Sequence, residues 1–287
     1  MICIYHSRDL DGWCSAAIVV KWFRTLSFRN DNLTMIGWDY GQHIPNIPKN
    51  EEVILVDISL PVETMALLTK ENNLVWIDHH ISAIKEMTDN NIDPHGQRDP
   101  KFSACELSWM YLFGTKLPEF VRLLGRYDCF GHKGTEEEQQ VLEFQYAARA
   151  YYKSYEDCYQ ALENADIDKL LETGKSIYKY LCTEAVQDYS KTFPIEIFNK
   201  EQVSGEPDKY RFLAINRQRF NCINFGIDYH KDGYDGFACF HYADNKWNWS
   251  LYNDNGKVDC SKLAKQRGGG GHKGAAGFIE DVLFSKL

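Results

Sequence analysis

Residues 74–80, LVWIDHH, decide the fold of this 287-residue chain. Four apolar residues lead directly into Asp78, His79 and His80. A short apolar run of this kind is typical of a buried strand in a parallel sheet. In open α/β folds, ligands bind beyond the carboxyl ends of such strands. The stretch therefore predicts a parallel sheet with chemically active side chains at one edge.

Two earlier stretches repeat this pattern of an apolar run followed by acidic or imidazole side chains. Residues 2–5 (ICIY) lead into three such residues, and residues 53–56 (VILV) lead into one; in order they are His6, Asp9, Asp11 and Asp57. Asp128 follows a predicted helix over residues 118–127. Carboxylates together with imidazoles suit Mn²⁺ and related divalent ions. Three strand ends of this kind predict a metal site.

The number of candidate ligands indicates two metal ions. One ion needs about three or four protein ligands, whereas two ions roughly 3.5–4 Å apart that share a carboxylate use the whole set. Asp57 stands alone after the middle strand and is the natural bridge. Taken singly, each residue has an alternative without a metal. Asp11 could be a helix N-cap, Asp57 could be a polar residue of a loop, and the His79-His80 pair could lie on the surface. Taken jointly, these alternatives require that three predicted strands end in acidic residues by chance.

The remaining pattern predicts an α/β chain of two domains. Strands and helices alternate over residues 1–80, which favours βαβ units. Residues 88–101 are polar and predict a surface loop near the site. Helices are expected over residues 103–114, 118–127 and 136–187, the last with interruptions near Asn164 and Gly174; short strands over 209–216, 222–228, 235–242 and 246–252; and a helix over 261–266. The predicted domains are residues 1–190 and 191–287, joined by a helical connection.

Composition limits the partners and the compartment. The net charge is −9, which argues against binding of long duplex nucleic acid, because such binding depends on basic residues. A small phosphorylated substrate in a local basic pocket stays compatible with this charge. The nine cysteines form no C-x-x-C pair, so reduced, mostly buried thiols in a cytoplasmic protein are expected. The chain has neither a signal-peptide pattern nor an apolar run of membrane-spanning length, so no membrane partner is expected.

A second group of functional candidates lies in residues 268–278, GGGGHKGAAGF. Consecutive glycines let the backbone approach a ligand closely, and their amides can form an anion-binding nest. His272 and Lys273 would add charge or hydrogen bonds to a phosphate. The alternative is a flexible turn.

With these motifs assembled, the chain resembles the DHH phosphoesterases that carry a DHHA1 carboxy-terminal domain. This group includes nano-RNases, pAp phosphatases and RecJ exonucleases. Residues 78–80 match the motif that names the family, and residues 6–12 (HSRDLDG) resemble its first motif. Asp57 resembles the second motif and Asp128 the fourth. Residues 269–277 (GGGHKGAAG) resemble the GGGHxxAAG signature of the DHHA1 domain.

The resemblance implies a site and a fold. It implies a two-lobed protein whose active site lies in the cleft between a parallel-sheet DHH domain and a smaller α/β DHHA1 domain, with two Mn²⁺ ions; Mg²⁺ or another divalent ion is the alternative. The first ion would be held by His6, Asp9 and Asp57, and the second by Asp11, Asp57, His79 and Asp128. His80 would face the phosphate or support the metals, and Asp78 would orient an imidazole. Substrate would be gripped by Gly269, Gly270, Gly271, His272 and Lys273.

Two departures from the family pattern concern substrate and metal geometry. Only two residues separate His6 from Asp9, where many members have three. Residues 250–253 (SLYN) lack the arginine that many nano-RNase-like members use to hold a terminal phosphate. Arg8 is a candidate phosphate contact, with a solvated surface charge as its alternative. Ser103 is a candidate substrate contact, with a helix N-cap as its alternative.

The sequence thus predicts a cytoplasmic, metal-dependent phosphodiesterase for linear dinucleotides or very short oligonucleotides. The alternatives are a phosphatase for pAp-like nucleotides, an exopolyphosphatase-like enzyme, and a nucleotide sensor without turnover. Homodimers are common in such families.

Overall fold

The computed structural model describes residues 1–26, 32–114, 116–199, 208–218 and 220–283. These residues form two compact units, Met1–Ile177 and Tyr178–Leu287. The units divide within a long helix, α8 (Ile167–Tyr189). The predicted domain boundary between residues 190 and 191 lies just after this helix ends, and stays a prediction about functional domains.

A four-stranded parallel sheet forms the centre of the N-terminal unit, as the sequence predicted. Its strands have the order β2-β1-β3-β4, and every neighbouring pair is parallel. They span β1 (Ile2–His6), β2 (Thr34–Trp38), β3 (Glu52–Val56) and β4 (Asn73–Ile77). The apolar residues of β1, β3 and β4 are mostly buried, because helices cover both faces of the sheet.

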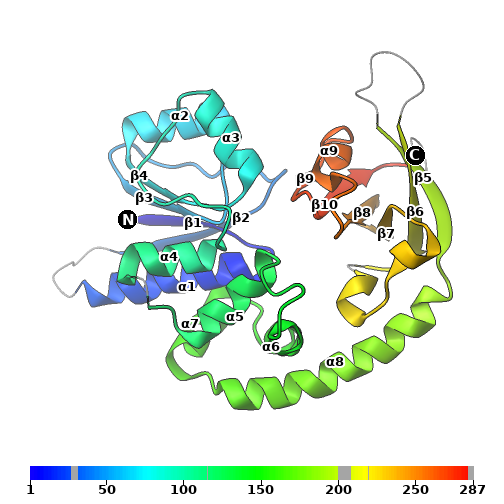
Figure 1. Ribbon diagram of the computed structural model, residues 1–287. Helices are drawn as coiled ribbons and strands as arrows, with labels where there is room; N and C mark the ends of the chain where they lie inside the picture. Colours follow the sequence, from blue (N-terminus) through cyan, green and yellow to red (C-terminus); the bar gives the residue numbers. More distant parts are fainter. Residues whose placement is uncertain (27–31, 115, 200–207, 219, 284–287) are drawn as a thin grey trace. The chain divides into compact units, whose positions relative to one another are not determined.

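Figure 1 shows how the helices cover this sheet. Helices α2 (Val62–Glu71) and α3 (Ile81–Asp89) lie on one face, and α1 (Leu10–Thr25) and α4 (Ala104–Phe113) lie on the other. Helices α5 (Glu119–Asp128), α6 (Glu138–Tyr151) and α7 (Tyr155–Asn164) extend the core beside α1. The predicted interruption at Gly174 is wrong, since α8 continues through it. Gly174 instead lets α8 approach α6 closely, because a Cβ there would lie 2.0 Å from the Glu143 carbonyl oxygen.

The polar segment over residues 88–101 is not only a surface loop. Within it, His95 forms a parallel bridge with Val75 of β4, and Arg98 forms one with Asp78 just after β4. The Trp76 amide donates to the His95 carbonyl at 2.7 Å. Gly96 makes this approach possible, because its φ is +128° and a Cβ would lie 2.0 Å from the Trp76 carbonyl oxygen. The segment therefore covers the outer edge of the sheet.

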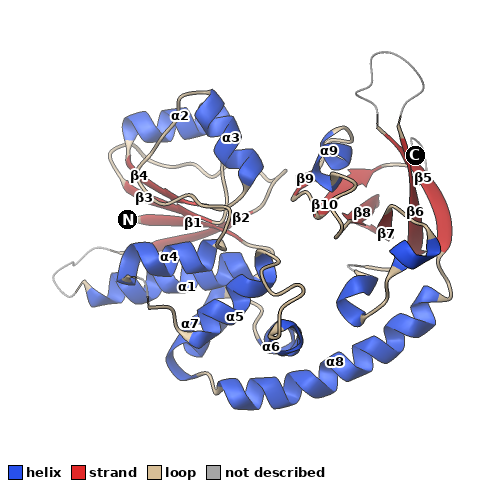
Figure 2. Ribbon diagram, in the orientation of Figure 1, coloured by secondary structure: helices blue, strands red, loops and turns tan. Residues whose placement is uncertain are grey.

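A second, mixed sheet forms the C-terminal unit, as Figure 2 shows. Its strand order is β5-β6-β7-β8-β10-β9. The strands span β5 (Phe193–Phe198), β6 (Lys209–Asn216), β7 (Gly236–Ala243), β8 (Lys246–Tyr252), β9 (Gly270–Gly271) and β10 (Ala275–Glu280). Helix α9 (Cys260–Lys265) shares a core with this sheet. The fold class predicted from the sequence, a parallel-sheet domain followed by a smaller α/β domain, is confirmed for each unit.

One predicted strand of this unit is wrong. Residues 222–228 contain a 3₁₀ helix, η1 (Cys222–Phe225), in place of a strand. The Asn221 side chain accepts a hydrogen bond from the Ile223 amide, and Gly226 ends the turn with a φ of +78°. Such side-chain capping and a left-handed glycine favour a turn over the β propensity of the apolar residues.

Two further expectations concern burial and membrane contact. Seven of the nine cysteines are buried, so the predicted burial of the thiols is confirmed. Among the residues that the structure describes, no helix is both long and apolar enough to span a bilayer.

Candidate metal centre

The parallel strands bring the predicted ligands to one edge of the sheet. His6 is the last residue of β1, Asp57 follows β3, and Asp78 and His79 follow β4. The carboxyl ends of neighbouring parallel strands lie side by side, so residues far apart in the sequence meet there. Two groups of side chains result, and both include an oxygen of Asp57.

The first group consists of His6, Asp9 and Asp57. His6 Nδ1 lies 3.1 Å from Asp9 Oδ2 and 3.3 Å from Asp57 Oδ2. Asp9 is the N-cap of α1 and accepts a hydrogen bond from the Gly12 amide at 3.0 Å. The first turn of α1 approaches β1 closely, since a Cβ on Gly12 would lie 2.0 Å from the His6 carbonyl oxygen. Two of the three side chains are therefore held by one strand–helix junction.

The second group is centred on His79 Nε2. This atom lies 3.3 Å from Asp128 Oδ2, 3.4 Å from Asp57 Oδ1 and 3.6 Å from Asp11 Oδ2. Asp128 is the last residue of α5. The structure thus brings together all six residues predicted as metal ligands, in the two groups that the family resemblance implied.

Asp11 has a role that the sequence did not predict. The alternative that it is an N-cap of its own helix is wrong, because Asp9 caps α1 and Asp11 lies inside its first turn. Its two carboxylate oxygens accept hydrogen bonds, each 2.8 Å long, from the Ala104 and Cys105 amides at the start of α4. A carboxylate at a helix N-terminus is stabilised by the helix dipole. Asp11 therefore fixes α4 against α1 beside the second group.

Asp57 links the two groups. Its side chain is 2% exposed, and its φ of +60° lies in the left-handed region that non-glycine residues seldom occupy. Such backbone strain is found disproportionately at functional sites. Oδ2 faces His6 while Oδ1 faces His79, and no described residue donates a hydrogen bond to Oδ1. A buried oxygen without a hydrogen-bond donor is suited to bind a metal ion. The set of carboxylates and imidazoles suits Mn²⁺ or a similar ion.

The carboxylates and imidazoles of the centre shift one another's pKa values. Burial alone would raise the pKa of Asp57, but contacts with His6 and His79 hold it well below its ordinary value. Burial, reinforced by the charge of Asp57 and opposed by His79, raises the pKa of Asp128 to about 6. Burial alone would lower the pKa of His79, but the contact with Asp57 and the charge of Asp128 raise this pKa to about 11. Without a metal, the imidazoles therefore hold protons among the carboxylates.

Metal binding is expected to release protons, because an imidazole must be neutral to coordinate an ion. His79, with its pKa raised to about 11, is protonated at pH 7 before binding, so metal affinity should increase with pH. Isothermal titration of Mn²⁺ into the protein at pH 7, in two buffers with different ionisation enthalpies, measures this release. Equal heats of binding in both buffers would contradict it.

Asp78 is an orienting residue in this geometry. It is fully buried, and its Oδ1 accepts hydrogen bonds from the His79 amide at 2.7 Å, the His80 amide at 3.0 Å and His80 Nδ1 at 2.7 Å. Trp76 Nε1 donates to Asp78 Oδ2 at 3.2 Å and to the Ile58 carbonyl at 3.0 Å. Against the effect of burial, the Asp78 contact raises the pKa of His80 to about 8. The ring of His80 is thereby fixed at the sheet edge.

Arg8 and Ser103 differ in their availability to a substrate. The side chain of Arg8 is 59% exposed, and its Nε lies 2.5 Å from Asp39 Oδ2. Ser103 is fully buried, and its hydroxyl and the Glu106 side chain form a capping box for α4. The capping role that the sequence left open for Ser103 is the one that its surroundings support.

Asp39 is a site residue that the sequence analysis missed. It directly follows β2, in the same position relative to its strand as Asp57 to β3. Its Oδ1 lies 3.5 Å from His6 Nε2. Despite partial burial, the contacts with His6 and Arg8 lower the pKa of Asp39 to about 2. The pattern of a strand ending in aspartate was present, but Gly41, Pro45 and Pro48 predict a loop over residues 39–50.

The glycine-rich segment belongs to the C-terminal unit and is described there by itself. Gly270 and Gly271 form β9, which pairs with β10, and the His272 amide donates to the Ala275 carbonyl at 2.7 Å. A Cβ on Gly269 would lie 2.0 Å from the Gly277 carbonyl oxygen. His272 and Lys273 thus lie in a tight hairpin turn, and its packing requires glycine at position 269. Substrate binding by this segment stays a prediction.

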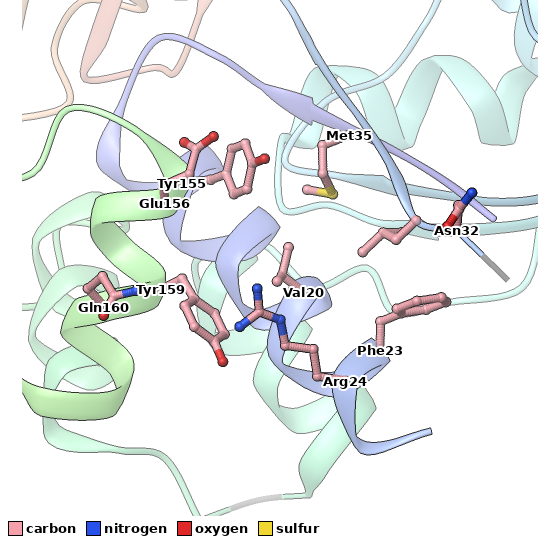
Figure 3. A pocket seen from close by; sticks show the side chains of 10 residues that line it. Val20, Phe23, Arg24, Asn32, Met35, Tyr155, Glu156, Tyr159 and Gln160 are labelled. Carbon is pink, nitrogen blue, oxygen red and sulfur yellow. The ribbon is translucent and has the colours of Figure 1, made fainter. Parts of the chain in front are cut away.

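A separate pocket of about 420 Å³ lies in the N-terminal unit. Figure 3 shows its lining from α1, α7 and the start of β2, including Arg24, Tyr159 and Met35. The Arg24 guanidinium lies 4.3 Å from the centre of the Tyr159 ring. Met35 is near the amino end of β2, whereas the predicted ligands follow the carboxyl ends. This pocket is therefore not part of the metal centre.

Comparison with known proteins agrees with the site. Residues 1–126 match the model of the DHH family, N-terminal domain. The N-terminal part of the chain is therefore similar to the N-terminal domain of the DHH family. Every predicted metal ligand except Asp128 lies within the matched residues.

Particular relatives extend over most of the chain. The uncharacterized protein R106 of Acanthamoeba polyphaga mimivirus is 24% identical over 96% of this chain, which spans 66% of that relative's length. An exopolyphosphatase-related protein from Bacteroides fragilis has a similar structure, with a TM-score of 0.51 at 12% identity, covering 100% of this chain and 87% of its own. A pGpG-specific phosphodiesterase, PggH from Vibrio cholerae, gives a TM-score of 0.47 at 12% identity, covering 97% and 92%.

Proposed function

We propose that this protein is a metal-dependent phosphodiesterase that hydrolyses linear dinucleotides or very short oligonucleotides to mononucleotides. The observation that carries this proposal is Asp57, whose two oxygens face separate groups of potential ligands. That arrangement suits two divalent ions bridged by one carboxylate, with Mn²⁺ as the preferred ion. The similarity of residues 1–126 to the DHH-family domain supports the same class of reaction.

In this proposal, His6, Asp9 and Asp57 hold one ion. Asp57 is shared with the second ion, whose other ligands are Asp11, His79 and Asp128. When bound, such a pair supplies positive charge for phosphoryl oxygens and lowers the pKa of a water molecule to near neutrality. The strand ends and the first turn of α1 pre-position the ligands, so little reorganisation is needed when substrate arrives.

His80 has a defined part in this proposal. Asp78 contacts its Nδ1 at 2.7 Å, which fixes the ring, and in this proposal its Nε2 acts on the substrate. In this role His80 would hold a proton near a phosphate oxygen of the substrate. The C-terminal unit would add the hairpin of Gly269, Gly270, Gly271, His272 and Lys273 as a phosphate contact.

The net charge of −9 supports a small substrate. A long polyanion would be repelled by an acidic surface. A short nucleotide needs only the local positive charge of the proposed metal ions and Arg8. The same chemistry would serve a pAp-like nucleotide or polyphosphate, and these are the second candidates. We also propose a reducing, cytoplasmic setting, supported by the seven buried cysteines; a homodimer stays a prediction.

A turnover panel with Mn²⁺ tests the substrate. It compares linear dinucleotides, a five-nucleotide RNA, pAp, a cyclic dinucleotide, pyrophosphate and polyphosphate. We expect the highest kcat/KM for linear dinucleotides, because a short substrate can place its phosphodiester at the metals without further contacts. A preference for pAp or polyphosphate would change the proposed substrate but not the proposed two-metal mechanism. Binding of metals without turnover of any compound would favour a nucleotide sensor.

A further inference from the structure

Asp39 contacts two residues of the proposed site at once. It directly follows β2, which pairs with β1 in the register that places Trp38 opposite His6. Its Oδ1 lies 3.5 Å from His6 Nε2, and its Oδ2 lies 2.5 Å from Arg8 Nε. The Asp39 side chain is 15% exposed. One carboxylate therefore connects a predicted metal ligand with a predicted phosphate contact.

The carboxylate of Asp39 is held in place by its own turn. The Tyr40 amide donates to Asp39 Oδ1 at 2.9 Å. The Asp39 amide donates to Gln42 Oε1 at 3.1 Å, and the Gln42 amide donates to the Asp39 carbonyl at 3.2 Å. Local bonds of this kind are typical of aspartate in turns and fix its side chain without help from His6.

The two nitrogens of His6 face different partners. Nδ1 faces Asp9 and Asp57, at 3.1 Å and 3.3 Å, whereas Nε2 faces Asp39. Histidines that bind metals usually donate their other ring N–H to a carboxylate or carbonyl, which fixes the tautomer and raises the basicity of the ligating nitrogen. Asp39 lies on the side of the ring away from the first ligand group, in the position that this role requires.

We propose that Asp39 is a positioning residue that holds His6 with Nδ1 toward the first metal ion and holds Arg8 at the same edge to contact a substrate phosphate. The inference rests on the proposed function. By accepting the Nε2–H of His6, Asp39 favours the tautomer in which the lone pair of Nδ1 faces the ion. A guanidinium carries five N–H donors, so the contact through Nε leaves donors of Arg8 for a phosphate oxygen.

The metal part of the proposal is tested on the full chain by titrating Mn²⁺ into Asp39→Ala and Asp39→Asn. Loss of such an outer partner typically costs 10–100-fold in metal affinity, so Asp39→Ala should weaken one Mn²⁺ by about that factor. Asp39→Asn should weaken it less, because the amide oxygen still accepts from Nε2 and keeps nearly the same shape. Mn²⁺ affinity equal to that of the parent protein in both variants would overturn the role toward His6.

Asp93→Asn is the matched control for these variants. Asp93 is also paired with an arginine, Arg98 Nη2 at 2.7 Å, but its side chain is 89% exposed. It lies outside both ligand groups, so this variant should keep the parent's Mn²⁺ affinity. The control separates the position of Asp39 from the general effect of removing one aspartate–arginine pair.

Arg8→Ala tests the substrate part. This variant should leave Mn²⁺ affinity unchanged and raise KM about tenfold, the loss expected when one charge-assisted hydrogen bond is removed. Unchanged KM would overturn the role of Arg8. If Asp39→Ala weakens Mn²⁺ binding while the parent protein hydrolyses none of the panel compounds, the positioning of His6 stands and the proposed phosphodiesterase activity fails, so the two failures are distinguishable.

Discussion

Asp57→Asn is expected to abolish hydrolysis, with kcat lower by about 10³-fold or more, since a bound metal supplies several kcal/mol of transition-state stabilisation. The amide keeps the shape of the side chain but offers one acceptor oxygen, whereas the carboxylate presents Oδ2 to His6 and Oδ1 to His79. Steady-state kinetics with Mn²⁺ and a metal titration should show both the loss of turnover and the loss of one ion.

The control for this variant is Asp89→Asn, which removes an exposed carboxylate that is paired with Lys85 on α3. It should retain parent kinetics, because surface pairs of this kind contribute little. Near-normal turnover of Asp57→Asn would exclude the bridging role of Asp57 and with it the two-ion assignment.

Gly12→Ala is the second change with a large expected effect. The new Cβ would lie 2.0 Å from the His6 carbonyl oxygen, a backbone atom that cannot move without displacing β1. Overpacking of this kind typically costs up to about 3 kcal/mol of unfolding free energy. A shift of α1 also moves Asp9 and Asp11 relative to His6, and a displacement of about 1 Å can lower turnover about 10²-fold. Urea unfolding and kinetics measure the two effects.

Gly134→Ala separates this steric effect from the general effect of losing a glycine. Gly134 has a φ of +70°, and nothing lies within 4 Å of a Cβ built on it. Its replacement should cost only the roughly 1–2 kcal/mol of a left-handed backbone and leave turnover unchanged. Equal stability of Gly12→Ala and the parent protein would show that the junction between β1 and α1 tolerates a side chain.

The sheet and most of the candidate centre could be predicted from short-range patterns. Apolar runs that end in aspartate or histidine identified β1, β3 and β4, and the parallel arrangement then required His6, Asp57 and His79 to meet. Each of these signals lies within a few residues of sequence, where hydrophobic periodicity and chain length are informative.

What the sequence did not show depends on contacts between distant residues. The bonds from Asp11 to the α4 amides join residues 93 and 94 positions apart, and no local pattern encodes them. Residues 95–98 contain Gly96 and charged groups typical of a turn, but in the structure they pair with the edge of the sheet beside Trp76. Asp39 was missed because β2 is less buried than its neighbours and turn formers follow it directly.

The backbone of Asp57 shows that this protein is not built for greatest stability. Its left-handed φ is strained for a residue with a side chain. Glycine at this position would relieve this backbone strain but would also remove the carboxylate that His6 and His79 contact. The position therefore illustrates a trade-off between stability and activity, and a search for variants that tolerate heat would be drawn toward replacements that inactivate the protein.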